Sequence, residues 1–238
     1  MTRTYCEFAY LPKYCAAWLE GLATTLPDPA RTLEIGTGSG CSLRAVLLGL
    51  ALHNDVHSWS VDISERPYLD DQMKIHGISK DRYTFILSPS QEAVKTWVIP
   101  LDLLYIDADH TYEGAKADIE SWTPHLKFGG LLVLDDYECQ WHDVTKAVDK
   151  LMFAKSSTWR FVGQVGRTIA FEKGTLHRRA PWLTDAMWKW DSHAKSKESE
   201  KDPWLWWGWG FGMTFEGGGY MPHSYGKSPK KSYTEDLS

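Results

Sequence analysis

Two kinds of segment alternate along most of this chain. Short runs of consecutive apolar residues, typical of buried strands, are separated by stretches with apolar residues at helical spacing. The predicted strands are residues 31–36, 57–63, 82–88, 101–107, 130–135, 158–163 and 167–172, and the predicted helices are residues 40–53, 66–76, 90–98, 112–125 and 141–154. A further apolar stripe over residues 11–25, closed by Pro27 and Pro29, predicts a helix before the first strand.

The repeated order of strand and helix predicts right-handed crossovers and a mainly parallel sheet with helices on both faces. Only the turn between Gly163 and Gly166 separates the last two strands, so these should form an antiparallel hairpin. We therefore expect an α/β, Rossmann-like fold with a mainly parallel seven-stranded sheet that ends in a C-terminal antiparallel hairpin. That combination is typical of class I methyltransferases, and a plain dinucleotide-binding domain does not usually end that way.

The pattern divides the chain near residue 172. Residues 1–172 should form the cofactor-binding domain, with residues 1–29 as an N-terminal helical segment. Residues 173–238 form a C-terminal extension that holds seven of the 13 tryptophans and a glycine-rich run, and its end, residues 227–238, has the composition of a disordered segment. The tryptophans of this extension suit packing on the core, a lid over an acceptor, or a partner surface.

Charge and cysteine content narrow the class of protein. The net charge is −5 overall, and it is −7 over residues 1–172, so no basic surface points to nucleic acid. The four cysteines form no CxxC pair, which favours a reduced, intracellular chain. No signal peptide and no membrane-spanning apolar run is evident, so we expect a cytoplasmic protein that does not bind membranes.

The first predicted strand ends in a glycine turn of the kind that approaches a nucleotide-type cofactor. Glu34 is followed by Gly36, Gly38 and Gly40, and then by the helical run. Glycines are needed where a backbone turns sharply against a ligand. Cys41 stands where the nicotinamide fingerprint requires its third glycine, which disfavours an NAD-dependent oxidoreductase.

Polar residues after the next two strands complete the candidate cofactor site. Asp62 ends the second strand, where a carboxylate can accept hydrogen bonds from both ribose hydroxyls of an adenosine, although a solvated strand end is the alternative. Ile63 follows it directly. Ser90 and Gln91 begin the helix after the third strand, in the turn that flanks the adenine in methyltransferases, and Ser90 suits an N-cap equally well.

Three carboxylates follow two later strands. Asp107 ends one apolar run, and Asp135 and Asp136 end the next, so all three should meet at one edge of a parallel sheet. Carboxylates that converge repel one another unless a cation lies between them, and oxygen ligands suit Mg²⁺, Mn²⁺ or Ca²⁺. Helix capping is the alternative role. His110 lies three residues after Asp107, where it suits either a structural role or catalysis.

The segments Asp107–Asp118, Leu126–Gly130 and Leu134–Tyr137 resemble the macrocin and mycinamicin sugar O-methyltransferases, and the resemblance extends over residues 30–172. It implies that S-adenosylmethionine binds at the glycine turn, with Asp107 among its contacts. It also implies that Asp107, Asp135 and Asp136 hold Mg²⁺ and that His110 is the general base. Tyr137 and His142 are candidates for the acceptor pocket.

The sequence thus predicts an S-adenosylmethionine-dependent O-methyltransferase, assisted by Mg²⁺, that methylates a hydroxyl of a small molecule such as a sugar, polyol or phenol. The alternatives are a methyltransferase for another acceptor such as an amine, and a non-catalytic cofactor-binding or scaffold protein that uses the tryptophan-rich extension. Homo-oligomerisation stays open.

Overall fold

A computed structural model describes residues 11–153 and 158–174 of the chain. The strands are β1 (Ala30–Ile35), β2 (Val56–Asp62), β3 (Tyr83–Leu87), β4 (Leu101–Ile106), β5 (Leu126–Leu134), β6 (Trp159–Val165) and β7 (Thr168–Lys173). The α-helices are α1 (Lys13–Ala23), α2 (Cys41–Gly49), α3 (Leu69–Ile75), α4 (Ser90–Ala93), α5 (Tyr112–Trp122) and α6 (His142–Val148). Short helical turns η1 (Lys80–Arg82), η2 (Val94–Thr96), η3 (Thr123–His125) and η4 (Asp149–Phe153) adjoin them.

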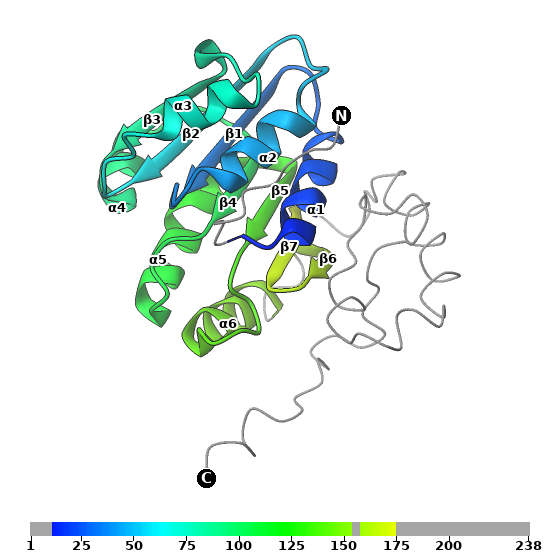
Figure 1. Cartoon of the computed structure of the whole chain (residues 1–238). Helices are drawn as coiled ribbons and strands as arrows, with labels where there is room; N and C mark the ends of the chain where they lie inside the picture. Colours follow the sequence, from blue (N-terminus) through cyan, green and yellow to red (C-terminus); the bar gives the residue numbers. More distant parts are fainter. Residues whose placement is uncertain (1–10, 154–157, 175–238) are drawn as a thin grey trace, which may run out of the picture.

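The seven strands form one sheet in the order β3-β2-β1-β4-β5-β7-β6. The first five pair in parallel, and β7 pairs antiparallel with both β5 and β6. This confirms the predicted Rossmann-like sheet with its C-terminal hairpin. Figure 1 shows that the chain order reverses between β1 and β4, which is where an open α/β sheet binds its ligand.

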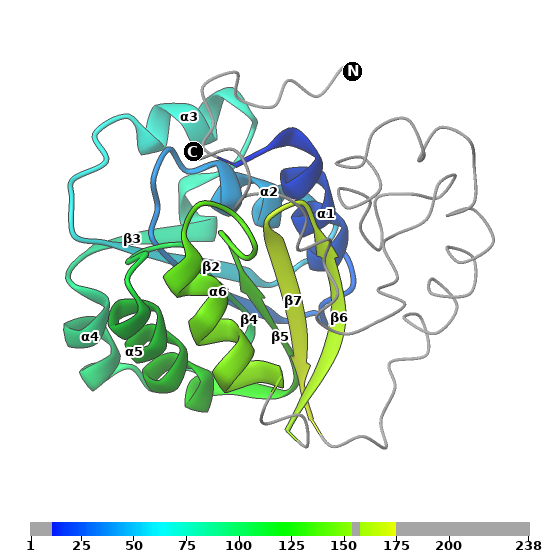
Figure 2. The same ribbon diagram turned by 90° about the horizontal axis from the view of Figure 1, so that it is seen from below.

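Two helical layers cover the sheet, as expected (Figures 1 and 2). Helices α1, α2 and α3 pack on one face, where they bury residues such as Trp18, Leu47 and Met73. Helices α5 and α6 pack on the other face, with Trp122 and Val148 in their core. The two cores take alternate residues of the same strands, because successive side chains of a strand point to opposite faces of the sheet.

The predicted boundaries differ from the observed ones where the backbone departs from regular geometry. Strand β5 begins at Leu126, four residues earlier than expected, because Leu126 already pairs with Leu101. The pairing then jumps to Leu103 with Leu131, so residues 127–130 form a bulge that contains Gly129 at a φ of +82°. The stretch predicted as one helix over residues 90–98 is the short α4 followed by η2.

The structure leaves part of the predicted organisation outside the described residues. The expected N-terminal helix is present as α1, whereas residues 1–10 and the tryptophan-rich extension beyond Gly174 are not described. Among residues 11–153 and 158–174, no helix has the length and apolar character needed to cross a membrane.

Candidate functional site

The glycine turn after β1 is held against the end of β4. The amide of Gly36 donates to the carbonyl of Val61 (2.9 Å), and the amide of Asp107 donates to the carbonyl of Ile35 (2.8 Å). Gly36 has a φ of +89°, and a Cβ atom there would lie 1.7 Å from the carbonyl oxygen of Asp107. Gly36 is therefore required both by its backbone conformation and by this close approach.

The rest of the turn is open or packed on helix α3. Gly38 has a φ of +49°, and a Cβ atom there would meet nothing within 4 Å. Gly40 has a left-handed backbone and caps α2, and a Cβ atom there would lie 2.6 Å from the side chain of Leu69. The open face at Gly38 is where a ligand can approach the backbone.

Asp62 accepts hydrogen bonds from this turn. Its Oδ2 accepts from the amides of Thr37 (3.0 Å) and Gly38 (3.3 Å) and from the guanidinium of Arg66 (2.6 Å), while its Oδ1 accepts from the amide of Ser64 (2.8 Å). Burial alone would raise the pKa of Asp62, but the hydrogen bonds from Arg66, Ser64 and Thr37 outweigh it and hold the pKa below its usual range. Asp62 is thus an ionised acceptor fixed beside the glycine turn.

Ile63 lies next to this carboxylate with 76% of its surface exposed. A large apolar side chain at that exposure, beside a polar cradle, suits contact with the flat face of a ligand.

Glu34 does not face the turn's open side. Its carboxyl group accepts hydrogen bonds from Ser42 of α2 and from Ser60 of β2 (2.6 Å), and it is 3% exposed. Burial raises the pKa of Glu34 to about 8, although the hydrogen bonds from the two serine hydroxyls act to lower it. Its observed partners are therefore protein groups below the turn.

Ser90 and Gln91 lie at the start of α4, as predicted, and both bind the same acid. The hydroxyl of Ser90 donates to Oδ1 of Asp118 at 2.5 Å, and the amide of Gln91 donates to the same oxygen at 2.8 Å. Burial raises the pKa of Asp118, although the hydrogen bonds from Ser90 and Gln91 act to lower it. No sequence pattern indicated a partner for Asp118, and the structure shows that these hydrogen bonds link α4 to α5.

Asp107, His110 and Asp136 converge at the ends of β4 and β5. The Nε2 atom of His110 lies 2.7 Å from Oδ2 of Asp136 and 3.7 Å from Oδ1 of Asp107. The nearby carboxylate of Asp107 raises the pKa of His110, burial opposes this rise, and the charge of Asp136 adds to it. The imidazole therefore lies between two carboxylates that stabilise its protonated form.

Trp141 stacks on the other side of this histidine. Its ring lies 4.5 Å from that of His110, with 17° between the planes, and it keeps 41% of its surface exposed. The stack restricts the orientation of the imidazole and gives the site an exposed aromatic edge.

Tyr137, a candidate for the acceptor pocket, is instead buried, and its hydroxyl donates to Asp149 at 3.0 Å. It therefore packs in the core and does not line a pocket.

Asp135 turns toward the hairpin. Its Oδ2 lies 3.0 Å from Arg167, its Oδ1 accepts a hydrogen bond from Thr168 (2.7 Å), and burial raises its pKa to about 7. Arg167 also contacts Oδ1 of Asp136 at 2.9 Å.

Within the part of the chain that the structure describes, the side chains that gather as metal ligands are Asp107, His110 and Asp136, whose ligand atoms all lie within 4.8 Å of one another. The ligands predicted from the sequence were Asp107, Asp135 and Asp136, so the observed cluster has His110 in the place of Asp135. Two carboxylates and an imidazole can hold a divalent cation.

Sequence reasoning missed Arg167 and Trp141. Arg167 follows the glycine turn of the hairpin, and its proximity to the acids depends on β7 pairing with β5. Trp141 directly precedes α6, and the sequence had placed it only as the first residue of the predicted helix over residues 141–154. Neither position carried a local signal of function.

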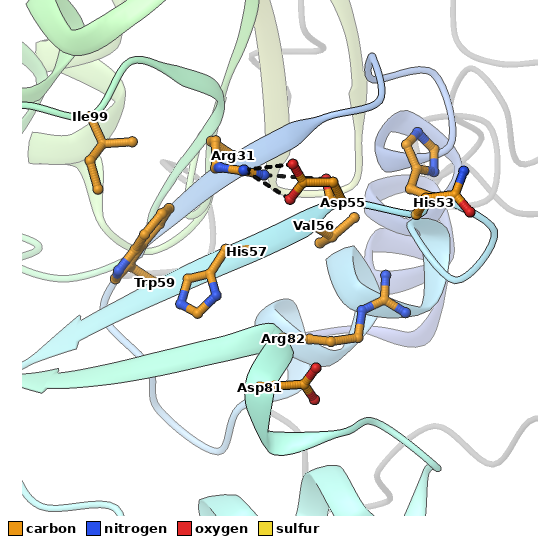
Figure 3. Close-up of a pocket in the computed structure, with 10 residues that line it drawn as sticks. Arg31, His53, Asp55, Val56, His57, Trp59, Asp81, Arg82 and Ile99 are labelled. Atoms are coloured by element: carbon orange, nitrogen blue, oxygen red, sulfur yellow. Dashed lines mark hydrogen bonds and ion pairs between the residues drawn. The ribbon is translucent and has the colours of Figure 1, made fainter.

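A separate hollow of about 800 Å³ lies at the opposite, amino-terminal end of the sheet (Figure 3). Its cations are engaged: Arg31 pairs with Asp55 at 2.8 Å, and Arg82 donates to the carbonyl of Leu50 at 2.7 Å. His57 also hydrogen-bonds Thr84, so these side chains of the hollow are already bound to other protein groups. The acids and the histidine that converge lie at the other edge of the sheet.

Comparisons with known proteins indicate the class of protein to which this chain is similar. Residues 33–137 match the family model described as "Methyltransferase domain". The chain is 27% identical to "Uncharacterized protein R132" of Acanthamoeba polyphaga mimivirus in an alignment of 159 residues that covers 60% of this chain and 71% of the relative.

Solved structures share the fold. The O-methyltransferase from Bacillus cereus in complex with SAH (S-adenosylhomocysteine) has a TM-score of 0.53 at 16% identity, over 68% of this chain and 84% of its own. The MycE methyltransferase from the mycinamycin biosynthetic pathway, in complex with Mg and SAH, has a TM-score of 0.52 at 17% identity, over 74% of this chain and 54% of its own. The match of residues 33–137 to a methyltransferase domain, on this fold, supports the enzyme class expected from the sequence, an S-adenosylmethionine-dependent methyltransferase.

Proposed function

We propose that this protein transfers the methyl group of S-adenosylmethionine to a hydroxyl group of a small molecule such as a sugar, polyol or phenol. One observation carries the proposal: Gly36 of the cofactor turn packs against the carbonyl of Asp107, the residue that also contacts His110. The cofactor turn and the acid–histidine cluster are thus in direct contact, so a donor bound at the first lies beside a base at the second.

The residues of the turn fit S-adenosylmethionine. The backbone at Gly38 is open to a ligand, Asp62 is held ionised as an acceptor for ribose hydroxyls, and Ile63 offers an apolar face for the adenine. Glu34, Gly40, Ser90, Gln91 and Asp107 are the further contacts predicted from the sequence. When bound, S-adenosylmethionine supplies a methyl group already activated by the sulfonium.

His110 acts as the general base in this proposal. An alcohol is barely ionised at neutral pH, so a base must take its proton as the methyl group is transferred. If Nε2 donates to Asp136, which lies 2.7 Å away, the lone pair of Nδ1 is left to accept that proton. Asp107 and Asp136 then stabilise the imidazolium that forms. A positioned base of this kind contributes about 10²–10⁴-fold to the rate.

The same cluster suits Mg²⁺, and the MycE neighbour was solved with Mg. Asp107 and Asp136 would hold the ion through their oxygens beside His110, because Mg²⁺ prefers carboxylate ligands. Such an ion would lower the pKa of the acceptor hydroxyl and orient it. Asp135, the third ligand predicted from the sequence, contacts Arg167 and Thr168 instead.

The test begins with calorimetric titration of the full chain with S-adenosylmethionine and S-adenosylhomocysteine, each with Mg²⁺ and with EDTA. A panel of sugars, polyols, phenols and amines is then assayed for methyl transfer. We expect binding of both cofactor forms, transfer to a hydroxyl acceptor, and lower turnover in EDTA. Transfer to amines alone would refute the acceptor class, and a folded chain that binds neither cofactor form would favour the scaffold alternative.

The His110→Ala variant tests the base. Its turnover should fall by about 10²–10⁴-fold while its affinity for S-adenosylhomocysteine is unchanged. His125→Ala is the matched control, because His125 lies in η3 before β5, at the opposite end of the sheet. Full turnover of His110→Ala would rule out the assignment.

A further inference from the structure

Arg167 joins the two acids that follow β5. Its Nη2 atom lies 3.0 Å from Oδ2 of Asp135, and its Nη1 atom lies 2.9 Å from Oδ1 of Asp136. Its own backbone is fixed, because its carbonyl accepts a hydrogen bond from the amide of Tyr137 at 2.8 Å. The turn between β6 and β7 is therefore anchored on the segment that carries the acids.

One guanidinium reaches both acids because the strand ends before them. Successive side chains of a regular strand point to opposite faces, but β5 ends at Leu134 and Asp136 has a left-handed backbone with a φ of +59°. The carboxylates of Asp135 and Asp136 can then both contact Arg167. This pairing matters because both acids are buried, and an unpaired buried charge costs several kcal/mol, by a rough general estimate.

Each acid uses its second oxygen differently. Oδ1 of Asp135 accepts a hydrogen bond from the hydroxyl of Thr168 at 2.7 Å, so both carboxylate oxygens of Asp135 contact residues of the hairpin. Oδ2 of Asp136 lies 2.7 Å from Nε2 of His110. Asp136 thus bridges Arg167 and the histidine, with one oxygen on the guanidinium and the other on the imidazole.

We propose that Arg167 is the built-in cation of this site and a positioning residue for His110. It directs Asp136 onto His110, and it withholds Asp135 from any divalent cation that binds at Asp107 and Asp136 beside that histidine. The effect on His110 rests on the proposed function. The effect on Asp135 does not, because cation binding is measurable without an acceptor.

The proposal predicts what happens when Arg167 is removed. In Arg167→Met the two buried acids lose their cation, and Asp135 becomes available as a further oxygen ligand. Carboxylates brought together without a cation repel one another, so a divalent ion should bind more tightly and restore stability. Arg160→Met is the matched control: Arg160 lies on the same hairpin and pairs with the buried Glu172, away from the acids of the site.

The first experiment uses the full chain of the wild type and both variants, with Mn²⁺ as the probe. Mn²⁺ affinity is measured by electron paramagnetic resonance, and thermal unfolding is recorded in EDTA and in Mn²⁺. We expect Arg167→Met to bind Mn²⁺ about 10–100-fold more tightly than the wild type, the range by which supporting residues tune metal sites. Its Tm should fall in EDTA and recover in Mn²⁺, whereas the Tm of Arg160→Met should fall without recovery. Unchanged Mn²⁺ affinity, with no recovery, would overturn the proposal.

A second variant covers the case in which Arg167→Met does not fold. Arg167→Lys keeps the positive charge, but its compact ammonium group cannot contact both acids at once as the planar guanidinium does. Its Mn²⁺ affinity should lie above that of the wild type, and affinity equal to the wild type would overturn the proposal.

The positioning role is read from kinetics. In Arg167→Met kcat should fall by about 10–100-fold, with KM for S-adenosylmethionine unchanged and partial recovery of kcat in Arg167→Lys. A rise in KM alone would instead indicate a structural effect. If no acceptor is methylated by the wild type, the Mn²⁺ and unfolding results still decide the role of Asp135.

Discussion

Glu34→Gln tests whether a buried carboxyl group beneath the glycine turn is protonated in the folded protein. Burial raises the pKa of Glu34 from its ordinary value of 4.5 to about 8, even though Ser42 and Ser60 donate to it. At neutral pH the folded chain therefore holds a proton that the unfolded chain releases. Glutamine has the shape of the protonated acid and cannot ionise, so the substitution removes this difference.

The magnitude follows from proton linkage. Between pH 4.5 and 8 the folded state binds one more proton at Glu34 than the unfolded state, so the free energy of unfolding falls as the pH rises. Each pH unit in this window costs about 1.4 kcal/mol, which amounts to about 3 kcal/mol between pH 4.5 and pH 7. Glu34→Gln should be close to the wild type in stability at the acid end and more stable by about 3 kcal/mol at pH 7.

The assay is urea unfolding of the wild type and Glu34→Gln at pH 5, 6, 7 and 8. The matched control is Glu92→Gln, which removes an exposed carboxylate of α4 paired with Lys95 and should change stability by at most about 1 kcal/mol. A difference between Glu34→Gln and the wild type that stays constant from pH 5 to 8 would refute the reasoning. Titration of Glu34→Gln with S-adenosylhomocysteine separately tests the predicted contact of Glu34 with the cofactor.

Four further substitutions test the site. Asp62→Ala should weaken S-adenosylhomocysteine binding by about 10–100-fold in calorimetry, because it removes a charged acceptor, and an unchanged Kd would exclude Asp62 from the ribose site. Gly36→Ala and Gly38→Ala each place a side chain at positive φ, at a cost of about 1–2 kcal/mol, but only Gly36→Ala meets the Asp107 carbonyl. Gly36→Ala should therefore lower the Tm much further, and equal Tm values would contradict the packing described here. Trp141→Ala removes the ring stacked on His110, so kcat or the acceptor KM should change while S-adenosylhomocysteine affinity, measured by calorimetry, does not; a weaker affinity would place Trp141 at the cofactor instead.

The positions of the glycine turn and of His110 were predictable because their geometry is local. Gly36 follows β1 directly, and His110 follows the end of β4 by four residues, so the apolar runs that define the strands also locate both residues. The spacing of three residues from Asp107 to His110 is enough to bring their side chains to 3.7 Å.

The partners of the other polar residues were not predictable in this way. Ser90 and Gln91 contact Asp118, which lies more than 25 residues further along, because α4 packs beside α5. Glu34 points below the turn because it lies on the strand face that α2 covers, and the apolar pattern of a strand buried on both faces does not reveal which face a residue takes.

The sequence by itself determined the seven-stranded sheet, its terminal hairpin, and the edge at which the glycine turn, Asp107, His110 and the twin acids meet. It could do so because apolar runs mark the strands, and parallel crossovers bring their carboxyl ends to one edge. Only the tertiary structure decided which charges are paired there. Arg167 contacts Asp135 and Asp136 because β7 pairs antiparallel with β5, and the partner of a charged side chain depends on such long-range pairing and on side-chain direction, which no local pattern encodes.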